Sequence, residues 1–517
     1  MKSLYLLFSL ARADLLERAR RSSYLLTLGF SIYLAVVVYT GKIVLKLNKY
    51  RGVPDSAWFA ASMQLVCIIF ISLFGFYIVK NGIERDEQTR VGRILAATPL
   101  SKPLYTVGKT ISNFFVLASM VLVLASASVL MPLLQDRAGT DFGVLVFPFL
   151  FVALPCMSLV GALAVFFECV PHLRGGVGNV VYFFLWVGLL SLGVETKTAW
   201  FDFSGLSLFF WSMDSALQKV APGSVHGLQL NPGDTKAPLV FPWNGIHWTP
   251  ALVAEHFFWI AVALGIAYIA AFFFHRFDPS LDLPGARPTA RQPQLIPERE
   301  QETFAATSTH LTPLPSDDRG GSLTDLVLSE LKLMLKGVSR WWYCVAAGLF
   351  IASLVTPLAM SHGLLVAVWI WPLMIWSQMG TRESRYATTA FIFSAPSFLW
   401  RQLPAVWLAG VIVTFITGSG VLLRSFLRGD LHAILSWLVA AFLIPTLALA
   451  LGIWSGGPKT FEVVYLLWWY VGPLNRVPSL DFMGISAGAG HSLMYVLMTT
   501  VLLAASFLGR SWRPRYL

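Results

Sequence analysis

Residues 82–109 read GIERDEQTRVGRILAATPLSKPLYTVGK and lie between two long apolar runs. The stretch is densely charged, although only 13% of the 517 residues in the chain are charged. A charge in the bilayer interior costs about 2.5–3.5 kcal/mol on insertion scales, so this stretch is expected to be a solvated connection at one membrane face. We call Gly82–Lys109 the first charged segment.

The apolar runs on either side of this segment indicate the fold class. Hydrophobic residues make up 56% of the chain, and the mean hydropathy is +0.67. Many runs approach the roughly 20 residues that a helix needs to span a bilayer, whereas the strands of a membrane barrel would alternate over about 10 residues. The sequence therefore predicts an all-α polytopic membrane protein with about twelve transmembrane helices.

The expected transmembrane helices fall into two sets of six. The first set is about Ser23–Leu45, Ala57–Val79, Thr110–Leu134, Gly143–Phe167, Val177–Gly193 and Ala251–Phe274. The second set is about Trp341–Ala359, Gly363–Gln378, Ala405–Leu423, Leu431–Trp454, Phe461–Gly472 and His491–Leu508. An amphipathic interfacial helix is expected before each set, within residues 1–23 and 322–340. In the first of these helices, Arg18 lies off the expected apolar stripe.

The composition changes sharply between the two sets. Residues 276–321 are rich in proline, threonine, glutamine and charge and contain almost no aromatic residue, so they cannot bury a core and are expected to be a flexible linker. The predicted organisation is a first six-helix half over 1–275, a cytoplasmic linker over 276–321 and a second six-helix half over 322–517. The connection 194–249 is expected to be a partly structured extracytoplasmic element.

The basic residues indicate orientation rather than nucleic-acid binding. The formal net charge is +11, and we assign it to lysines and arginines on cytoplasmic flanks under the positive-inside rule. The prediction is a multi-pass protein of the inner (plasma) membrane, with both termini cytoplasmic and no nucleic-acid partner.

The two halves share sequence features that predict an internal duplication. Arg85-Asp86 followed by Thr98-Pro99 matches Arg382-Glu383 followed by Ala395-Pro396, with the same spacing from acid to proline. Residues 180–186 (VVYFFLW) match residues 463–469 (VVYLLWW). Because six spans is an even number, the halves would be parallel repeats related by an axis along the membrane normal. The alternative is that any two apolar halves resemble each other by composition.

The sequence offers few residues for chemistry. We find no phosphate-binding loop, no hydrolase or kinase motif and no metal-ligand spacing, so we predict no catalytic residue, no metal and no cofactor in this chain. Acids and histidines at mid-membrane are sparse, which counts against an ion-driven carrier. Four residues are candidates for a translocation path, with interhelical hydrogen bonding as the alternative for each: Gln64, Asn113, Asn179 and Glu462.

The first charged segment resembles a segment of a known family. In the ABC-2 type permeases, which are membrane subunits of ATP-binding cassette exporters, the segment after the second span reads roughly E-R-E-x-G-T-L-E-x-L-L-x-T-P-x-S. Glu84-Arg85-Asp86-Glu87-Gln88-Thr89 and residues 94–101 (ILAATPLS) match it in order, and Gly108-Lys109 resembles the family's G-K. Gln88 replaces the family's glycine, and Gly92-Arg93 falls where leucine or an acid is common.

This resemblance implies a function for the charged segments. The chain would be the permease subunit of an ABC-2 type exporter with two fused halves, moving an unidentified substrate with ATP and Mg²⁺ bound by separate cytoplasmic ATPase subunits, two per chain. The expected ATPase-coupling residues are Glu84, Arg85, Asp86, Thr89, Arg93, Thr98, Pro99, Ser101, Arg382, Glu383 and Pro396. Reversing the charge of Arg85 or Glu84 is expected to abolish stimulated ATP hydrolysis.

Two other readings of the sequence remain open. The first is a secondary transporter or channel that works without an ATPase, in which the charged segment is merely a solvated loop. The second is a membrane-embedded enzyme acting on lipid, which the missing catalytic residues argue against.

Overall fold

A computed structural model describes residues 2–19, 22–41, 43–53, 55–133, 142–196, 200, 202–222, 228–232, 239–275, 277, 322–336, 338–356, 361–386, 388–393, 398–475, 480–483 and 490–512. The predicted linker 276–321 lies outside these residues except for Phe277. The chain is mostly helical and forms two compact units, Met1–Phe277 and Asp278–Leu517, which we call unit 1 and unit 2.

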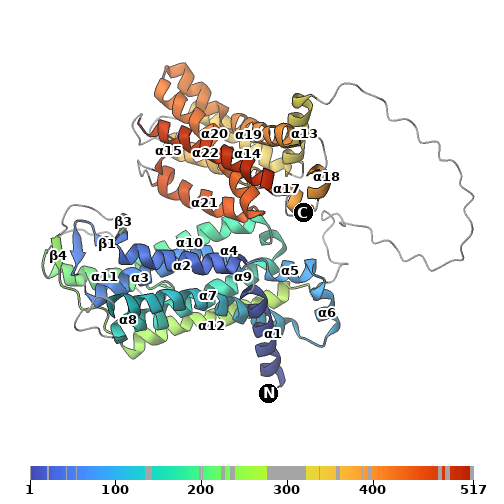
Figure 1. Cartoon of the computed structure of the whole chain (residues 1–517). Coiled ribbons are helices and arrows are strands. Elements are labelled where there is room, and N and C mark those ends of the chain that lie inside the picture. Colours follow the sequence, from blue (N-terminus) through green and yellow to red (C-terminus); the bar gives the residue numbers. More distant parts are fainter. Residues whose placement is uncertain are drawn as a thin grey trace, which may run out of the picture. The chain divides into compact units, whose positions relative to one another are not determined.

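Unit 1 is a bundle of apolar helices with different structures at its two ends. The helices α5 and α6 lie at one end of the bundle, whereas strands β1, β3 and β4 and helix α11 lie at the other (Figure 1). Its helical elements are α1 (Lys2–Ala19), α2 (Ser22–Tyr39), α3 (Ser56–Val66), η1 (Cys67–Ile71), α4 (Ser72–Val79), α5 (Gly82–Gln88), α6 (Val91–Ala97), α7 (Lys102–Leu133), α8 (Phe142–Pro148), η2 (Phe149–Ala153), α9 (Leu154–Cys169), η3 (Pro171–Leu173), α10 (Gly176–Thr196), α11 (Leu206–Gln218) and α12 (Pro250–Phe273).

The first expected span is shorter than predicted. The helix α2 ends at Tyr39 near Gly41, which has a φ of +69°, and Ile43–Leu47 forms strand β1 rather than the end of a helix reaching Leu45. The cause is the cap at this end of unit 1, in which β1 pairs with β3 (Leu228–Pro232) and with β2 (Tyr50–Gly52) in antiparallel fashion, while β2 pairs in parallel with β4 (Leu239–Phe241).

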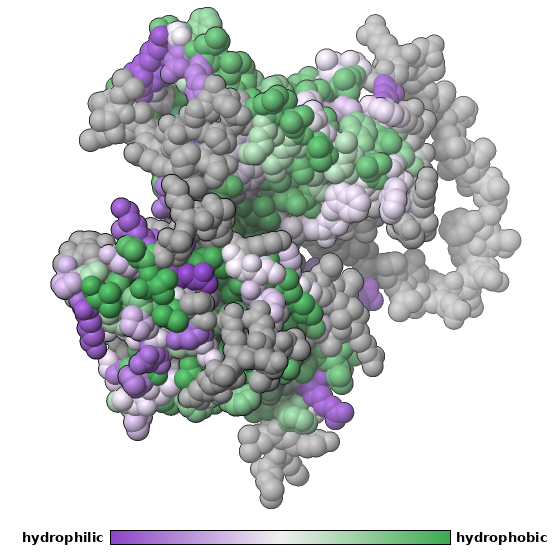
Figure 2. Space-filling view, turned by 60° about the vertical axis from the view of Figure 1, so that its left-hand side comes forward, coloured by the Kyte–Doolittle hydropathy of each residue, from purple (hydrophilic) through white to green (hydrophobic). Residues whose placement is uncertain are grey.

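The cap has its own hydrophobic core. The indole of Trp58 meets the rings of Phe241 and Trp243 edge to face, with centroids 5.6 and 5.9 Å apart. Met213 and Leu217 of α11 also belong to this core. The connection 194–249, which was expected to be partly structured, contains α11 and the strands β3 and β4. The space-filling view turned toward this end shows hydrophilic residues among hydrophobic ones (Figure 2).

Unit 2 consists of helices with a similar order of long and short elements. The helices are α13 (Leu323–Leu335), α14 (Arg340–Val355), α15 (Ser361–Ile370), α16 (Leu373–Trp376), α17 (Arg382–Arg385), α18 (Thr389–Phe393), α19 (Phe398–Arg428), α20 (Leu431–Ser455), α21 (Lys459–Trp469), η7 (Tyr470–Leu474) and α22 (Gly490–Trp512). Helix α20 packs against α19 and α22 and forms the buried centre of this unit.

Fewer helices are long enough to span a membrane than the sequence predicts. Within the described residues, eight helices are long and apolar enough to cross a bilayer, or nine if the bent pair α13 and α14 counts as one span. The apolar parts of α2 and of the α15–α16 pair are shorter, and α21 has only 11 residues. The chain is therefore a helical protein with several membrane-spanning candidates, and the described residues do not confirm the predicted number of twelve spans.

Candidate functional site

The first charged segment folds as two short helices followed by the start of a long one. Asn81 and Arg90 adopt left-handed backbone conformations, with φ of 86° and 61°, and they precede α5 and α6 respectively. The helix α6 ends at Ala97, just before Pro99, and the hydroxyl of Thr98 donates to the carbonyl of Leu95. Thr98 thus closes α6.

The turn between α4 and α5 is held between two opposite charges. The carboxylate of Glu168, at the end of α9, accepts the backbone N–H groups of Asn81, Gly82 and Ile83 at 2.7, 3.0 and 2.6 Å. Arg18 donates to the carbonyl of Val79, the last residue of α4, at 3.2 Å. An acid at a helix N-terminus and a base at a C-terminus both complement the helix dipole, so the two side chains fix the direction of this turn.

Arg18 therefore lies on the inner face of α1, contrary to the sequence expectation. It is 7% exposed and pairs with Asp14 one turn earlier, at 2.9 Å. A Cβ atom at Gly82 would lie 2.7 Å from Nη2 of this guanidinium, so a side chain there would require Arg18 to shift. The buried face of α1 thus includes the charged Asp14 and Arg18 as well as the apolar Ala11.

Arg85 and Asp86 face inward and bind other helices. Arg85 pairs with Asp14 of α1 at 2.7 Å and with Glu17 at 3.1 Å. Asp86 accepts from Tyr105 at 2.6 Å and pairs with Lys109 at 2.8 Å, both on α7. Two of the predicted coupling residues are therefore internal anchors that tie the segment to α1 and α7.

The carboxyl group of Asp14 is the centre of this network. Lys109 lies 2.9 Å from it, and Ser112 donates a hydrogen bond to it. Burial alone would raise the pKa of Asp14, but the charges of Arg18 and Lys109 and the hydrogen bonds from Ser112 and Lys109 hold it well below the ordinary value of 3.8. Asp14 is therefore ionised at neutral pH.

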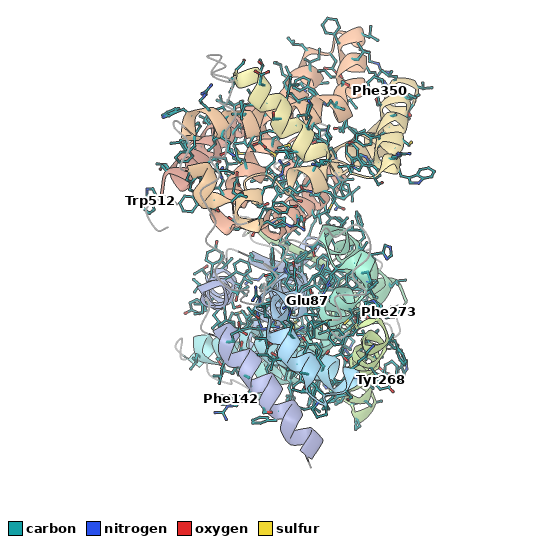
Figure 3. All side chains as sticks on the ribbon, turned by 90° about the vertical axis from the view of Figure 1, so that its right-hand side faces the viewer. Glu87, Phe142, Tyr268, Phe273, Phe350 and Trp512 are labelled. Carbon is teal, nitrogen blue, oxygen red and sulfur yellow. The ribbon has the colours of Figure 1, made fainter. Side chains whose placement is uncertain are left out.

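Several other residues of the segment point outward. Of the predicted coupling residues, Thr89, Arg93, Pro99 and Ser101 are exposed, whereas Glu84 and Thr98 are half-buried. The exposed residues of α6 and its approach include the apolar Ile94, which is 69% exposed, so we call Gln88–Ile94 the outer face. Figure 3 faces this end of unit 1 and labels Glu87, which adjoins the outer face.

Gly92 is the one buried residue of α6 and explains a departure from the family pattern. A Cβ atom at this position would lie 2.6 Å from the ring of Phe277. A leucine or acid could not fit there without moving that ring. The glycine therefore lets α6 lie flat on the cluster formed by Tyr105, Phe274 and Phe277.

Unit 2 contains a corresponding set of charged contacts. Arg382 of α17 pairs with Glu330 of α13 at 3.2 Å. Glu383 accepts from Gln402 at 3.3 Å and from Arg510 of α22 at 2.6 Å. Burial raises the pKa of Glu383, but the hydrogen bond and charge of Arg510 outweigh it, so the pKa lies below its ordinary value. Pro396 lies outside the described residues.

The residues that matched in sequence also make matching hydrogen bonds. The hydroxyl of Tyr182 donates to the carbonyl of Ser72, and the hydroxyl of Tyr465 donates to the carbonyl of Trp369, each at a distance near 2.8 Å (2.7 and 2.8 Å). Ser72 and Trp369 each lie 13 residues before the arginine of the charged pair, Arg85 or Arg382. Tyr105 and Gln402 each lie 19 residues after the acid to which they donate.

The candidate translocation residues do not form one group. Asn113 donates to the carbonyl of Gly161 at 3.2 Å, and Asn179 accepts from Lys80 at 2.7 Å, so both join elements within unit 1. Glu462 is 1% exposed in the first turn of α21 in unit 2. Gln64 is fully buried in α3, and its carboxamide has no hydrogen-bond partner among the described residues.

Comparison of the chain with protein-family models, curated proteins and solved structures gives no match. The similarity to ABC-2 type permeases consequently rests on the residues of the first charged segment and on the arrangement of the apolar runs. Among the described residues, no group of histidine, cysteine, aspartate or glutamate side chains is arranged to hold a metal ion.

Several residues of the two networks were missed by sequence reasoning. Asp14 and Glu330 are acids on the leucine-rich faces of α1 and α13. A charge on an apolar face of a helix is a signal from which the burial of both residues could have been predicted. Glu168 is a lone acid at the end of a long apolar run. Arg510 gave no local signal, because its partner Glu383 lies 127 residues earlier.

Proposed function

We propose that this chain is the permease of an ATP-driven exporter of the ABC-2 type, and that its ATPase docks on the outer face of the first charged segment. The observation that carries the proposal is the division of this segment into an anchored side and an exposed side. Arg85 and Asp86 are bound to α1 and α7, whereas Arg90, Arg93 and Ile94 face outward. A surface that combines positive charge with an exposed isoleucine suits a soluble protein partner.

The anchored side gives a route for transmitting movement. A partner that displaced the outer face would pull on α1 through Asp14 and on α7 through Lys109, because these pairs are buried and short. ATP and Mg²⁺ would be bound by the partner. The coupling requires that ATP binding favour one arrangement of the helices over another.

The matching contacts in the two units support the proposed duplication. In each unit an acid of the interfacial helix pairs with the arginine of the charged pair, and a tyrosine of the VVY stretch binds the carbonyl 13 residues before that arginine. We infer two parallel six-helix halves, about twelve spans in total, an inner-membrane location with cytoplasmic termini, and one ATPase contact on each half. The exported substrate is not specified by this reasoning.

The experiment that tests the docking surface compares exposed residues of α6 in unit 1 with exposed residues at the C-terminal end of α19 in unit 2. The tagged chain is purified from native membranes, and co-purifying, vanadate-sensitive ATP hydrolysis is measured. Ile94→Glu and Arg93→Glu should lose this activity while the chain still folds. Leu427→Glu and Arg428→Glu alter exposed residues at the far end of α19 and should retain it.

Two outcomes would contradict the proposal. Full ATP hydrolysis with both outer-face variants would remove the docking assignment. If the wild-type chain carries no ATPase but moves a solute down an ion gradient in vesicles, the secondary transporter or channel is the better function.

A further inference from the structure

The two buried acids of the charged pairs receive their positive charge from different helices. Asp86 in unit 1 is bound by Tyr105 and Lys109, both of which lie on α7. Glu383 in unit 2 is bound by Gln402 of α19 and by Arg510 of α22, the last helix of the chain. The neutral donors, Tyr105 and Gln402, each lie 19 residues after the acid that they bind. The cations, Lys109 and Arg510, do not lie at equivalent positions.

The sequence of α19 explains why the cation comes from elsewhere. Lys109 lies four residues after Tyr105, so the two side chains share one face of α7. The same step from Gln402 leads to Val406, which is apolar and buried. A buried carboxylate without a cation is strongly destabilising, so Glu383 needs a positive charge from another element.

The last helix of each unit makes a different kind of contact beside this acid. Phe274, directly after α12, stacks on Tyr105 with ring centroids 4.8 Å apart. In unit 2, Arg510 donates to both Glu383 and Gln402, at 2.6 and 3.0 Å, and is only 3% exposed. An aromatic contact in unit 1 thus has an ionic counterpart in unit 2.

We propose that Arg510 is the positioning residue of the second charged segment and replaces the cation that Lys109 gives to the first. As a consequence, α22 is tied directly to α17 by charge, whereas the described contacts of α12 and Phe274 with the first segment are apolar packing. This inference rests on the proposed duplication and adds an asymmetry to the proposed function. Movement of the second segment acts on the C-terminal helix, and movement of the first acts on α1 and α7.

The proposal predicts that Val406→Lys supplies the positive charge that Glu383 loses in Arg510→Ala, and that it thereby restores the stability of the second charged segment. The reporter is Thr381→Cys, because Thr381 is 3% exposed beside α17 and its labelling by a maleimide requires local opening. The background carries Cys344→Ser, since Cys344 is exposed and the other three cysteines are buried. Arg510→Ala should label about tenfold faster than the parent, and Val406→Lys with Arg510→Ala should return close to the parental rate.

The controls separate charge from packing and from global unfolding. Val406→Met with Arg510→Ala fills similar space without a charge and should stay fast. A reporter at Ile83→Cys, which is buried in unit 1, should label at the same rate in all variants. If Arg510→Ala does not fold, Arg510→Lys should fold and label slowly, and the Val406→Lys double variant should recover folded protein.

Either of two results overturns the inference. Labelling of Thr381→Cys at the parental rate in Arg510→Ala would show that Arg510 does not hold the segment. Equal rescue by Val406→Met and Val406→Lys would show that packing, not charge, is restored. Because no ATPase takes part in the measurement, its failure leaves the docking proposal intact, and loss of the docking proposal leaves this measurement unchanged.

Discussion

Arg85 of α5 lies 2.7 Å from Asp14 of α1, although the two residues are 71 positions apart in the chain. The pair joins α1, the first helix of the chain, to the charged segment that follows α4. Lys109 and Arg18 bind the same carboxylate, so one acid gathers three basic side chains from three elements. The charged segment is consequently part of the packed structure rather than a loop that only satisfies solvation.

The first prediction separates anchored arginines from exposed ones. Arg85→Ala should lower the free energy of unfolding by about 3 kcal/mol, because it removes one partner from a largely buried ionic network. Arg93→Ala should change it by less than about 0.5 kcal/mol, because Arg93 is exposed. Thermal unfolding of the purified protein in detergent measures both. A stable Arg85→Ala variant would contradict the anchoring role.

This result also changes the interpretation of charge reversal at Arg85. The sequence suggested that Arg85→Glu would test docking, but the structure places this residue against Asp14 and Glu17. A glutamate there would face two carboxylates, so lost activity would report damage to the network. Arg93 and Ile94 are the residues whose substitution tests docking alone.

The second prediction concerns acid stability. Since the pKa of Asp14 is held below its ordinary value of 3.8 in the folded protein, the folded state favours the ionised form. The stabilisation is fully present above about pH 4 and is lost as the pH falls further toward the folded pKa. Melting temperatures measured between pH 3 and pH 7 should therefore fall steeply at the acid end.

The matched variant for this prediction is Asp14→Asn. It cannot ionise, so it should be less stable than the wild type at neutral pH and should show a smaller fall at acid pH. If the variant kept the full acid dependence of the wild type, other carboxylates would have to account for it, and Asp14 would not be the controlling group.

The sequence was sufficient to predict a mostly helical chain with long apolar helices, but not the cap. Hydropathy located both ends of α12 and the end of α7 within a few residues, because a long apolar run has few other solutions in a membrane protein. Strand β1 was missed because Ile43–Leu47 is as apolar as the helix before it, and its structure depends on pairing with β3, some 185 residues later. Periodicity over five residues could not separate these alternatives.

The candidate site was predicted in part for a related reason. A local motif located Arg85, Asp86 and Arg93, but it did not distinguish the side chains that turn inward from those that turn outward. That distinction depends on Asp14, Lys109 and Glu168, which belong to other helices. Contacts between distant residues of this kind leave no spacing pattern in a single sequence.

The third prediction concerns the acid that holds the turn before α5. Glu168→Gln removes the charge that accepts the N–H groups of Asn81, Gly82 and Ile83, so the free energy of unfolding should fall by about 2 kcal/mol. Amide hydrogen exchange at Ile83 should become faster. Glu87→Gln is the control, because Glu87 forms a more exposed pair with Arg174 and should cost less than about 1 kcal/mol. Unchanged exchange at Ile83 in Glu168→Gln would refute the role of this carboxylate.

The fourth prediction uses the matched tyrosines to test whether the two units are built alike. Tyr182→Phe and Tyr465→Phe each remove one hydroxyl that donates to a backbone carbonyl, that of Ser72 or of Trp369. Each should lower the free energy of unfolding by about 1 kcal/mol, because each substitution removes one hydrogen bond of ordinary strength. Since the residues lie in different units, the two effects should add in the double variant.

Tyr268→Phe is the control for these substitutions, because Tyr268 of α12 is 54% exposed and lies at the rim of unit 1 in Figure 3. Its removal should leave the free energy of unfolding unchanged within about 0.5 kcal/mol. If Tyr182→Phe were costly and Tyr465→Phe were neutral, the shared stretches VVYFFLW and VVYLLWW would not support equivalent helix contacts. The proposed duplication would then rest on the arginines of the charged pairs alone. Arg85 and Arg382 would still share one feature, because each pairs with an acid of the first helix of its unit.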